Sequence, residues 1–189
     1  AVSPSTFTFA KSADGATLTT VDGTKDFQDG GSVNNIVIEE VAPNSLKDGG
    51  KVTLKLNSGF EFASNVTVDV ISADGTFKVD ADSSAGGEAA NITATRVSGD
   101  NRTIEFWTDG STSAKPAMIR ISGIKINEDG ADFGDMAEIT VSGDDVTKTT
   151  LEVGKLIDFS VSASVEDKDL PTIYSGNKLD GDNNETLKV

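Results

Sequence analysis

Residues 36–56 read IVIEEVAPNSLKDGGKVTLKL, and this stretch decides the fold class. In the run 51–56 apolar and polar residues alternate, so the apolar side chains share one face of an extended strand. The run 36–41 predicts a second strand, and the Pro, Asn and Gly residues between the two runs predict a loop. Within that loop, Leu46 is expected to return to the core. Strands separated by turn-rich loops are typical of an all-β domain.

The same alternation continues in both directions along the chain. Two hairpins are predicted, one joining 66–70 to 76–79 through an Asp-Gly turn and one joining 92–97 to 103–107. The remaining predicted strands are 6–10, 16–21, 60–62, 118–121, 124–126, 136–141 and 156–165, with a β-bulge predicted at Gly123. Short strands at this spacing predict an all-β fold, namely an antiparallel β-sandwich of Ig-like or jelly-roll-like type with terminal strand extensions.

The length of 189 residues suits one large sandwich better than two complete domains. We expect residues 1–32 to form an N-terminal strand segment that belongs to the same fold. Residues 33–166 are expected to form the sandwich core. Residues 167–189 are expected to form a linker arm followed by a C-terminal strand.

Composition excludes several classes of function. The formal net charge of −15 argues against nucleic-acid binding, because a polyanion would be repelled. The chain has no histidine and no cysteine, which removes the Ser-His-Asp triad, thiol catalysis and most zinc sites. No run approaches the roughly 18 apolar residues of a membrane helix, so no membrane insertion is expected. The chain is therefore predicted not to be an enzyme.

The first residues of the chain predict its location. It begins Ala1-Val2-Ser3-Pro4, and a small residue at the start is what cleavage of a signal peptide leaves behind. The alternative is a chain trimmed at its N-terminus for another reason. We expect an extracellular or cell-surface protein.

An acidic stretch near the C-terminus has the spacing of calcium ligands. Asp180, Asp182 and Asn184 offer oxygen atoms at every second residue. The pattern departs from a calcium loop at its sixth position, where Glu185 replaces glycine, and a polar turn is the alternative. No cofactor is predicted, with calcium as the one candidate. Similar acidic clusters occur in predicted loops at Asp80, Asp82, Glu128, Asp129, Asp132 and Asp135.

Trp107 is the single tryptophan of the chain. Glycosidases grip sugars with several aromatic side chains, and this chain has only one Trp and one Tyr beside its nine Phe. On a sandwich face, Trp107 offers a platform for carbohydrate. Packing in the core or at its rim is the alternative.

The C-terminal residues repeat an earlier pattern. Residues 29–38 read DGGSVNNIVI and residues 180–189 read DGDNNETLKV, so both place an Asp-Gly turn and an Asn pair before an alternating strand. The C-terminus is therefore similar to a second copy of the strand that opens the main domain.

Over roughly residues 33–189 the chain resembles repeat domains of clostridial and other Gram-positive S-layer-like surface proteins, which often occur beside copper-amine-oxidase-like stalk domains. Its matching pattern is IVIEE at 36–40, SLKDGGKVTLKL at 45–56 and GFEF at 59–62. The linker LPTIYSG at 170–176 resembles the joint between such repeats, with anchoring side chains at Leu170, Pro171, Ile173 and Tyr174. The resemblance implies an extracellular β-sandwich with a structural role, and it carries over no catalytic residues.

An alternating strand beyond the linker offers an unpaired ladder to another molecule. We therefore hypothesise a subunit of a surface layer or filament, in which residues 168–182 form an arm and the following strand docks into the next copy. The donor strand is Glu185, Thr186, Leu187, Lys188 and Val189, and the second candidate donor is Thr6, Phe7, Thr8 and Phe9. The expected partners are copies of the same chain and, in the alternative function, cell-wall glycan. A fragment of a longer protein is the other interpretation.

Overall fold

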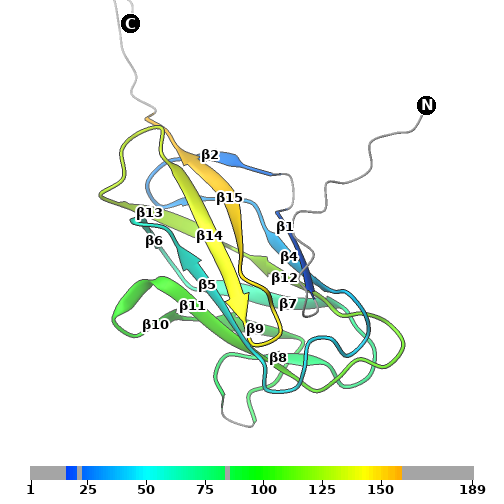
Figure 1. The fold of residues 1–189 in the computed structure, drawn as a ribbon. Coiled ribbons are helices and arrows are strands. Elements are labelled where there is room, and N and C mark those ends of the chain that lie inside the picture. Colours follow the sequence, from blue (N-terminus) through cyan, green and yellow to red (C-terminus); the bar gives the residue numbers. More distant parts are fainter. Residues whose placement is uncertain (1–15, 21–22, 84–85, 159–189) are drawn as a thin grey trace, which may run out of the picture. The chain divides into compact units, whose positions relative to one another are not determined.

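The computed structural model describes residues 16–20, 23–83 and 86–158, which form strands β1 to β15 (Figure 1). The chain divides into a compact unit, Ala1–Asp158, and a second unit, Phe159–Val189, which lies outside the described residues. The described residues contain no helix, and so none that is long and apolar enough to cross a membrane.

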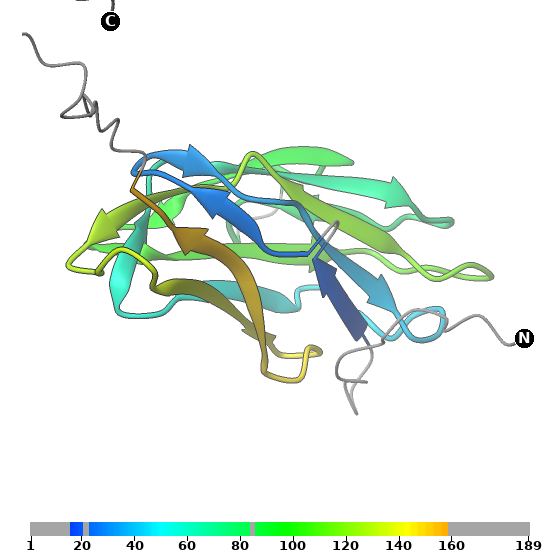
Figure 2. The same ribbon diagram turned by 90° about the horizontal axis from the view of Figure 1, so that it is seen from above.

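Two large sheets form the layers of the first unit, as the second view shows (Figure 2). The first sheet contains, in spatial order, β1 (Ala16–Thr20), β4 (Ile36–Glu40), β12 (Met118–Ser122), β7 (Val66–Ser72) and β9 (Asn91–Ala94), and all neighbouring pairs are antiparallel.

The second sheet contains, in spatial order, β10 (Arg96–Val97), β11 (Asp100–Asp109), β5 (Lys51–Leu56), β14 (Met136–Gly143), β15 (Thr149–Leu156) and β2 (Lys25–Phe27). A short strand, β8 (Lys78–Asp80), also pairs with β11. All of these pairs are antiparallel except β15 with β2, which is parallel. A small third sheet joins β3 (Gly31–Ser32), β13 (Lys125–Asp129) and β6 (Gly59–Phe62).

One hydrophobic cluster lies between these sheets. Val52, Leu54 and Leu56 face it as predicted, Ile36 and Ile38 also face it, and Leu46 returns to it from the loop as expected, with 1% of its surface exposed. β4 ends at Glu40, so Val41, which is exposed, lies beyond the strand predicted for 36–41. Burying each such side chain contributes about 1.5–3 kcal/mol. The predicted all-β sandwich is confirmed, while its assignment as Ig-like or jelly-roll-like stays a prediction. The largest fully buried side chains are Phe60, Phe62, Phe106, Ile36, Ile38, Leu46, Leu54, Leu56, Ile104, Ile119 and Ile121.

A buried carboxylate organises the loops at one end of β4. Glu40 is 2% exposed, and its Oε1 atom accepts a hydrogen bond from the Leu46 N–H at 2.9 Å. Its Oε2 atom accepts hydrogen bonds from the Thr112 hydroxyl at 2.8 Å and the Ala117 N–H at 2.6 Å. These bonds hold Leu46 against the core, because a buried carboxylate is tolerated only when its oxygens are paired.

The hairpin predicted for 66–70 and 76–79 is wrong. β7 pairs with β12 and β9 in the first sheet, whereas β8 pairs with β11 in the second. The intervening Asp74 does not close a hairpin, because its carboxylate accepts N–H bonds from Ser113, Ala114 and Lys115. The chain therefore crosses between the layers at this point.

The second predicted hairpin is only partly correct. Arg96 and Val97 pair with β11, but 91–94 pair with β7, so this run also changes sheet. Gly123 adopts a φ of 71° between β12 and β13, which belong to different sheets. It is therefore a corner and not the predicted bulge, and its left-handed conformation suits glycine.

The strand predicted for 156–165 begins earlier than expected. β15 spans Thr149–Leu156, and residues 157 and 158 lie in no strand. The rest of that predicted strand, and the strand predicted for 6–10, lie outside the described residues.

Candidate functional site

All of the candidate donor, linker and calcium residues lie outside the described residues, so their roles stay predictions. They are Thr6, Phe7, Thr8, Phe9, Leu170, Pro171, Ile173, Tyr174, Asp180, Asp182, Asn184, Glu185, Thr186, Leu187, Lys188 and Val189. The structure does describe a surface that could receive such a strand.

That surface is one side of β15. On its other side, β15 pairs with β14 from Thr149 to Lys155. Its neighbour β2 reaches only from Gly154 to Leu156. Between Thr149 and Val153, β15 therefore has no second paired strand within the described parts of the chain, although β1 lies near β15 without pairing with it. We call residues 149–153 the open edge.

The direction of the backbone groups on the open edge follows from the pairing of β14. The Asn57 N–H donates to the Glu138 carbonyl, and the Glu138 N–H donates to the Asn57 side chain, so the backbone of Glu138 faces β5. Glu138 pairs with Glu152. In an antiparallel pair of strands, two opposite residues either bond to each other through their backbone groups or both turn those groups away from each other. Because Glu138 turns its backbone groups to β5, Glu152 turns its own away from β14. Glu152 and, two residues earlier, Thr150 therefore present their N–H and C=O groups to the open side.

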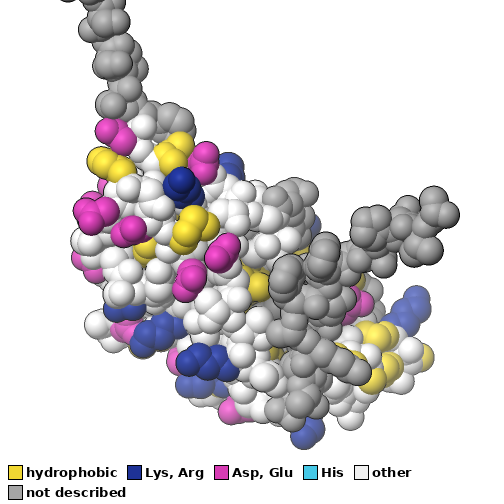
Figure 3. Space-filling model, turned by 45° about the horizontal axis from the view of Figure 1, so that its top comes forward, with side chains coloured by type: hydrophobic (Ala, Val, Ile, Leu, Met, Phe, Trp, Pro, Cys, Tyr) yellow, Lys and Arg dark blue, Asp and Glu magenta, His cyan; other side chains and the backbone are white. Residues whose placement is uncertain are grey.

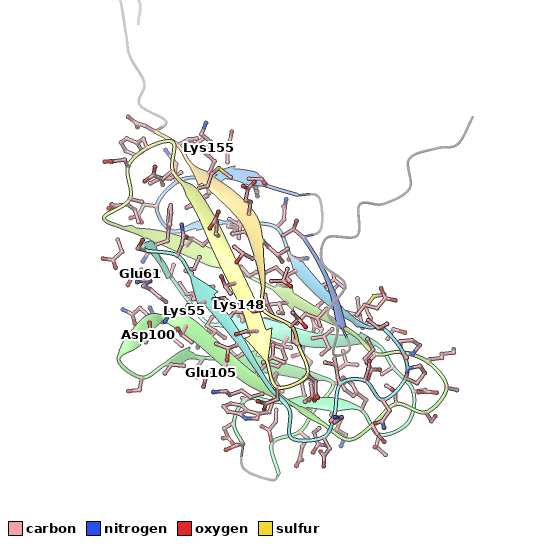
Figure 4. The ribbon with its side chains drawn as sticks, viewed as in Figure 1. Lys55, Glu61, Asp100, Glu105, Lys148 and Lys155 are labelled. Carbon is pink, nitrogen blue, oxygen red and sulfur yellow. The ribbon has the colours of Figure 1, made fainter. Side chains whose placement is uncertain are left out.

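The side chains of the open edge alternate as in a strand that covers a core. Thr149, Leu151 and Val153 are buried, whereas Thr150 and Glu152 are exposed. A strand added alongside would therefore bury one face and expose the other. Two lysines, Lys148 and Lys155, precede and follow the open edge in sequence and are labelled in Figure 4.

The short reach of β2 has a local cause. The chain enters β2 through Gly23, which has a φ of 74° and whose carbonyl accepts a hydrogen bond from the Asn34 side chain. At the other end, a Cβ atom on Gly154 would lie 2.7 Å from the ring of Phe27. This close packing fixes β2 against the last part of β15, and pairing begins only at Lys25, after the left-handed Gly23.

A groove of about 420 Å³ runs beside the open edge. Thr150, Leu151 and Glu152 line it from β15. The end of β1 and the residues before β2 line its other side, at Thr20, Gly23 and Thr24. The open edge is therefore accessible beside a hollow with an apolar floor at Leu151, which is 7% exposed.

A second hollow, of about 200 Å³, surrounds Trp107. Trp107 is half-buried on β11, where it pairs with Lys51 of β5 and Asp80 of β8. The lining residues are Gly49, Asp80, Asp82, Ser83, Glu88, Trp107, Thr108 and Asp109. The indole is therefore neither buried in the core nor fully exposed on a sandwich face, and it borders a hollow lined by acidic residues.

The pKa values of two carboxylates in this hollow are shifted in opposite directions. Burial, together with the neighbouring carboxylates of Asp48 and Glu88, raises the pKa of Asp109. The backbone N–H of Gly86, which donates to the Glu88 carboxylate at 2.8 Å, lowers the pKa of Glu88. Carboxylates of this kind accept hydrogen bonds from hydroxyl groups, and an aromatic face packs against an apolar ring.

The acidic clusters singled out in the sequence are engaged with the backbone. Asp80 accepts the N–H of Asp82, Glu128 accepts that of Gly130, and Asp135 accepts that of Asp132. Within residues 16–20, 23–83 and 86–158, no group of three or more acidic side chains is arranged to hold a metal ion. These carboxylates stabilise turns.

One large apolar side chain is exposed on the turn between β13 and β14. Phe133 is 69% exposed and lines a hollow of about 490 Å³. The turn is fixed by a 2.7 Å bond from the Gly134 N–H to the Leu156 carbonyl. Hydrophobic side chains lie among acidic ones on the upper part of Figure 3, and Asp29, Glu128, Asp132 and Asp158 line the hollow beside Phe133.

The chain matches no protein-family model and no curated protein. Function is therefore inferred from the surfaces just described. Sequence reasoning missed the open edge, although Thr149, Leu151 and Val153 do alternate in the sequence.

Proposed function

We propose that this protein is a non-enzymatic, extracellular structural protein, a subunit of a surface layer or filament that assembles head-to-tail by strand donation between copies. The observation that carries the proposal is the open edge of β15. Thr150 and Glu152 direct backbone N–H and C=O groups to a side where no strand of the described chain pairs with them. A strand from another molecule satisfies such groups.

The composition of the open edge supports this function. Sheets protect unused edges with proline, with several charged residues or with covering segments. Within the open edge, Glu152 is the single charged residue, and there is no proline. A contact between a donor on one face and an acceptor on another is heterologous, so it propagates from copy to copy unless its rotation closes a ring.

The proposed donor is residues 185–189, on the arm formed by 168–182, and residues 6–9 are the second candidate. The arm gives the donor its reach, since an extended chain spans about 3.3–3.6 Å per residue. The likeness to S-layer-like repeat domains and the charge of −15 favour a place on the cell surface. Surface labelling of intact cells with an antibody to the folded domain tests that location.

The primary experiment measures assembly. The intact chain is followed by size-exclusion chromatography with light scattering over a range of concentrations, with and without a chelator, and by negative-stain microscopy. We expect particles that grow with concentration. A variant lacking residues 180–189 is expected to stay monomeric. If the intact chain is monomeric throughout, the proposed function is wrong, and if the deletion leaves assembly unchanged, the C-terminal donor is wrong.

A second function is supported by the hollow around Trp107. A carbohydrate-binding or surface-binding module would use the indole as a platform and the neighbouring carboxylates as acceptors for hydroxyl groups. It predicts a monomer that binds cell-wall glycan and loses binding in Trp107→Ala. Phe133→Ala is the matched control, because it removes an exposed aromatic side chain elsewhere on the domain. Equal binding by both variants would exclude this function.

A further inference from the structure

The open edge has enough detail to fix how a donor strand lies on it, and this inference rests on the proposed function. We infer that residues 185–189 of a second copy lie parallel to β15, with Leu187 beside Leu151 and Lys188 beside Glu152. The acceptor is residues 149–153, of which Thr150, Leu151 and Glu152 line the groove next to the end of β1 and the residues before β2.

The inward and outward faces restrict the register. Leu187 and Val189 lie on one face of the donor and Thr186 and Lys188 on the other, because side chains alternate along a strand. Leu187 and Val189 must therefore lie on the buried side. In the parallel arrangement they continue the apolar row of β15, where Leu151 is 7% exposed and Val153 is fully buried.

The position of Glu185 distinguishes a donor strand parallel to β15 from an antiparallel one. Its side chain lies on the same face of the donor as Leu187 and Val189, which is the buried face. An antiparallel donor in the same register would put the Glu185 carboxylate beside Val153, in the apolar core and without a partner. A parallel donor puts it beside Thr149, a buried but polar residue at the first position of β15, directly after exposed Lys148 in the sequence. Burying an unpaired carboxylate is strongly unfavourable, so the parallel direction is preferred.

A different register does not remove the buried Glu185 carboxylate from an antiparallel donor, because β2 occupies the end of the edge. A shift that carried Glu185 past Val153 would place it where β2 already pairs with Gly154. A shift in the other direction would place it beside Leu151. The parallel donor meets no such conflict, and it runs in the same direction as β2, which is itself parallel to β15.

Charge on the outward face supports the same arrangement. Lys188 falls beside exposed Glu152, and a pair of opposite charges between neighbouring strands is favourable. In the antiparallel arrangement Lys188 would lie beside Thr150 and Thr186 beside Glu152.

Cysteine cross-linking tests this inference against a clean background, because the chain has no cysteine of its own. Full-length Glu152→Cys is mixed with full-length Lys188→Cys carrying a mass tag, and disulfide heterodimers are measured after mild oxidation. The pair Glu152→Cys with Thr186→Cys reports the antiparallel direction. The control pair is Glu138→Cys with Lys188→Cys, since Glu138 lies opposite Glu152 on β14 but is enclosed by β5 and β15.

We expect the 152–188 heterodimer to exceed the other two pairs by at least tenfold. A 152–186 heterodimer of equal or greater yield would overturn the parallel direction. Absence of heterodimers in samples that still assemble would overturn the inference and leave the proposed function standing. If the unmodified chain does not assemble at all, both are wrong.

Discussion

Thr140 and Thr150 lie opposite each other on β14 and β15, and their hydroxyl oxygens are 2.9 Å apart. The two residues differ in what their backbone N–H groups face. Thr140 faces Lys55 of β5, whereas Thr150 faces the open side. Proline has no N–H group, so Thr140→Pro removes a hydrogen bond inside the sheet, and Thr150→Pro removes a group that has no strand partner among the described residues.

Both variants lose the contact between the Thr140 and Thr150 hydroxyl groups, so a difference in their stability reports the loss of the backbone N–H group. Thr150→Pro is expected to lower the free energy of unfolding by about 1 kcal/mol, the scale of one cross-strand side-chain pair. Thr140→Pro also leaves a carbonyl of β5 unpaired and distorts a central strand, and is expected to cost about 3 kcal/mol or more.

Urea unfolding at low protein concentration measures this difference. With a denaturant dependence of about 2 kcal/mol per molar, the midpoint of Thr140→Pro should lie about 1 M below that of Thr150→Pro. Equal midpoints, or a lower midpoint for Thr150→Pro, would refute the reasoning, because the N–H of Thr150 would then be paired within the folded chain.

Three further predictions concern the stability of the sandwich. Glu40→Gln places its amide NH₂ group against at least one hydrogen-bond donor, either the Leu46 N–H or the pair formed by Thr112 and Ala117, and should cost about 2–4 kcal/mol in urea unfolding. Exposed Glu39→Gln should cost less than about 0.5 kcal/mol, and similar losses would contradict the role of the buried carboxylate. Gly154→Ala forces a Cβ atom to within 2.7 Å of the Phe27 ring and should cost about 1–3 kcal/mol, and an unchanged unfolding midpoint would argue against this packing. Backbone N–H bonds lower the pKa of Asp74 from 3.8 to about 2, so its stabilisation is present above pH 4 and is lost as the pH falls towards 2; the stability difference between the parent and Asp74→Asn should shrink over that interval, and a difference independent of pH would disprove the assignment.

The sequence predicts well those strands in which polar and apolar residues alternate along the whole run. The run 51–56 has polar residues at every second position and lies in the middle of a sheet, so the burial pattern repeats the sequence pattern. The hairpin of 66–70 with 76–79 failed because an Asp-Gly pair specifies a turn but not the partners of the strands. Asp74 bonds instead to the segment 113–115, far along the chain, and the two strands enter different layers.

β15 was misplaced for a related reason. Its alternation of Thr149, Leu151 and Val153 is interrupted because Gly154 is also buried, and the register with β14 shifts between Glu152 and Gly154. The sequence predicts a strand that begins at Leu156, whereas Leu156 is the last residue of β15. That the first part of β15 is open could not be predicted, because it depends on β2, whose residues lie near the other end of the chain.

A complementation experiment tests most directly whether copies join through the open edge. A Thr150→Pro subunit keeps its donor strand but has a blocked acceptor, and a subunit lacking residues 185–189 keeps its acceptor but has no donor. Each variant alone should be monomeric in light scattering under conditions where the parent chain assembles. Their mixture should form a dimer with one copy of each and nothing longer. Assembly by either variant alone, or a mixture that stays monomeric while the parent assembles, would contradict strand donation at β15.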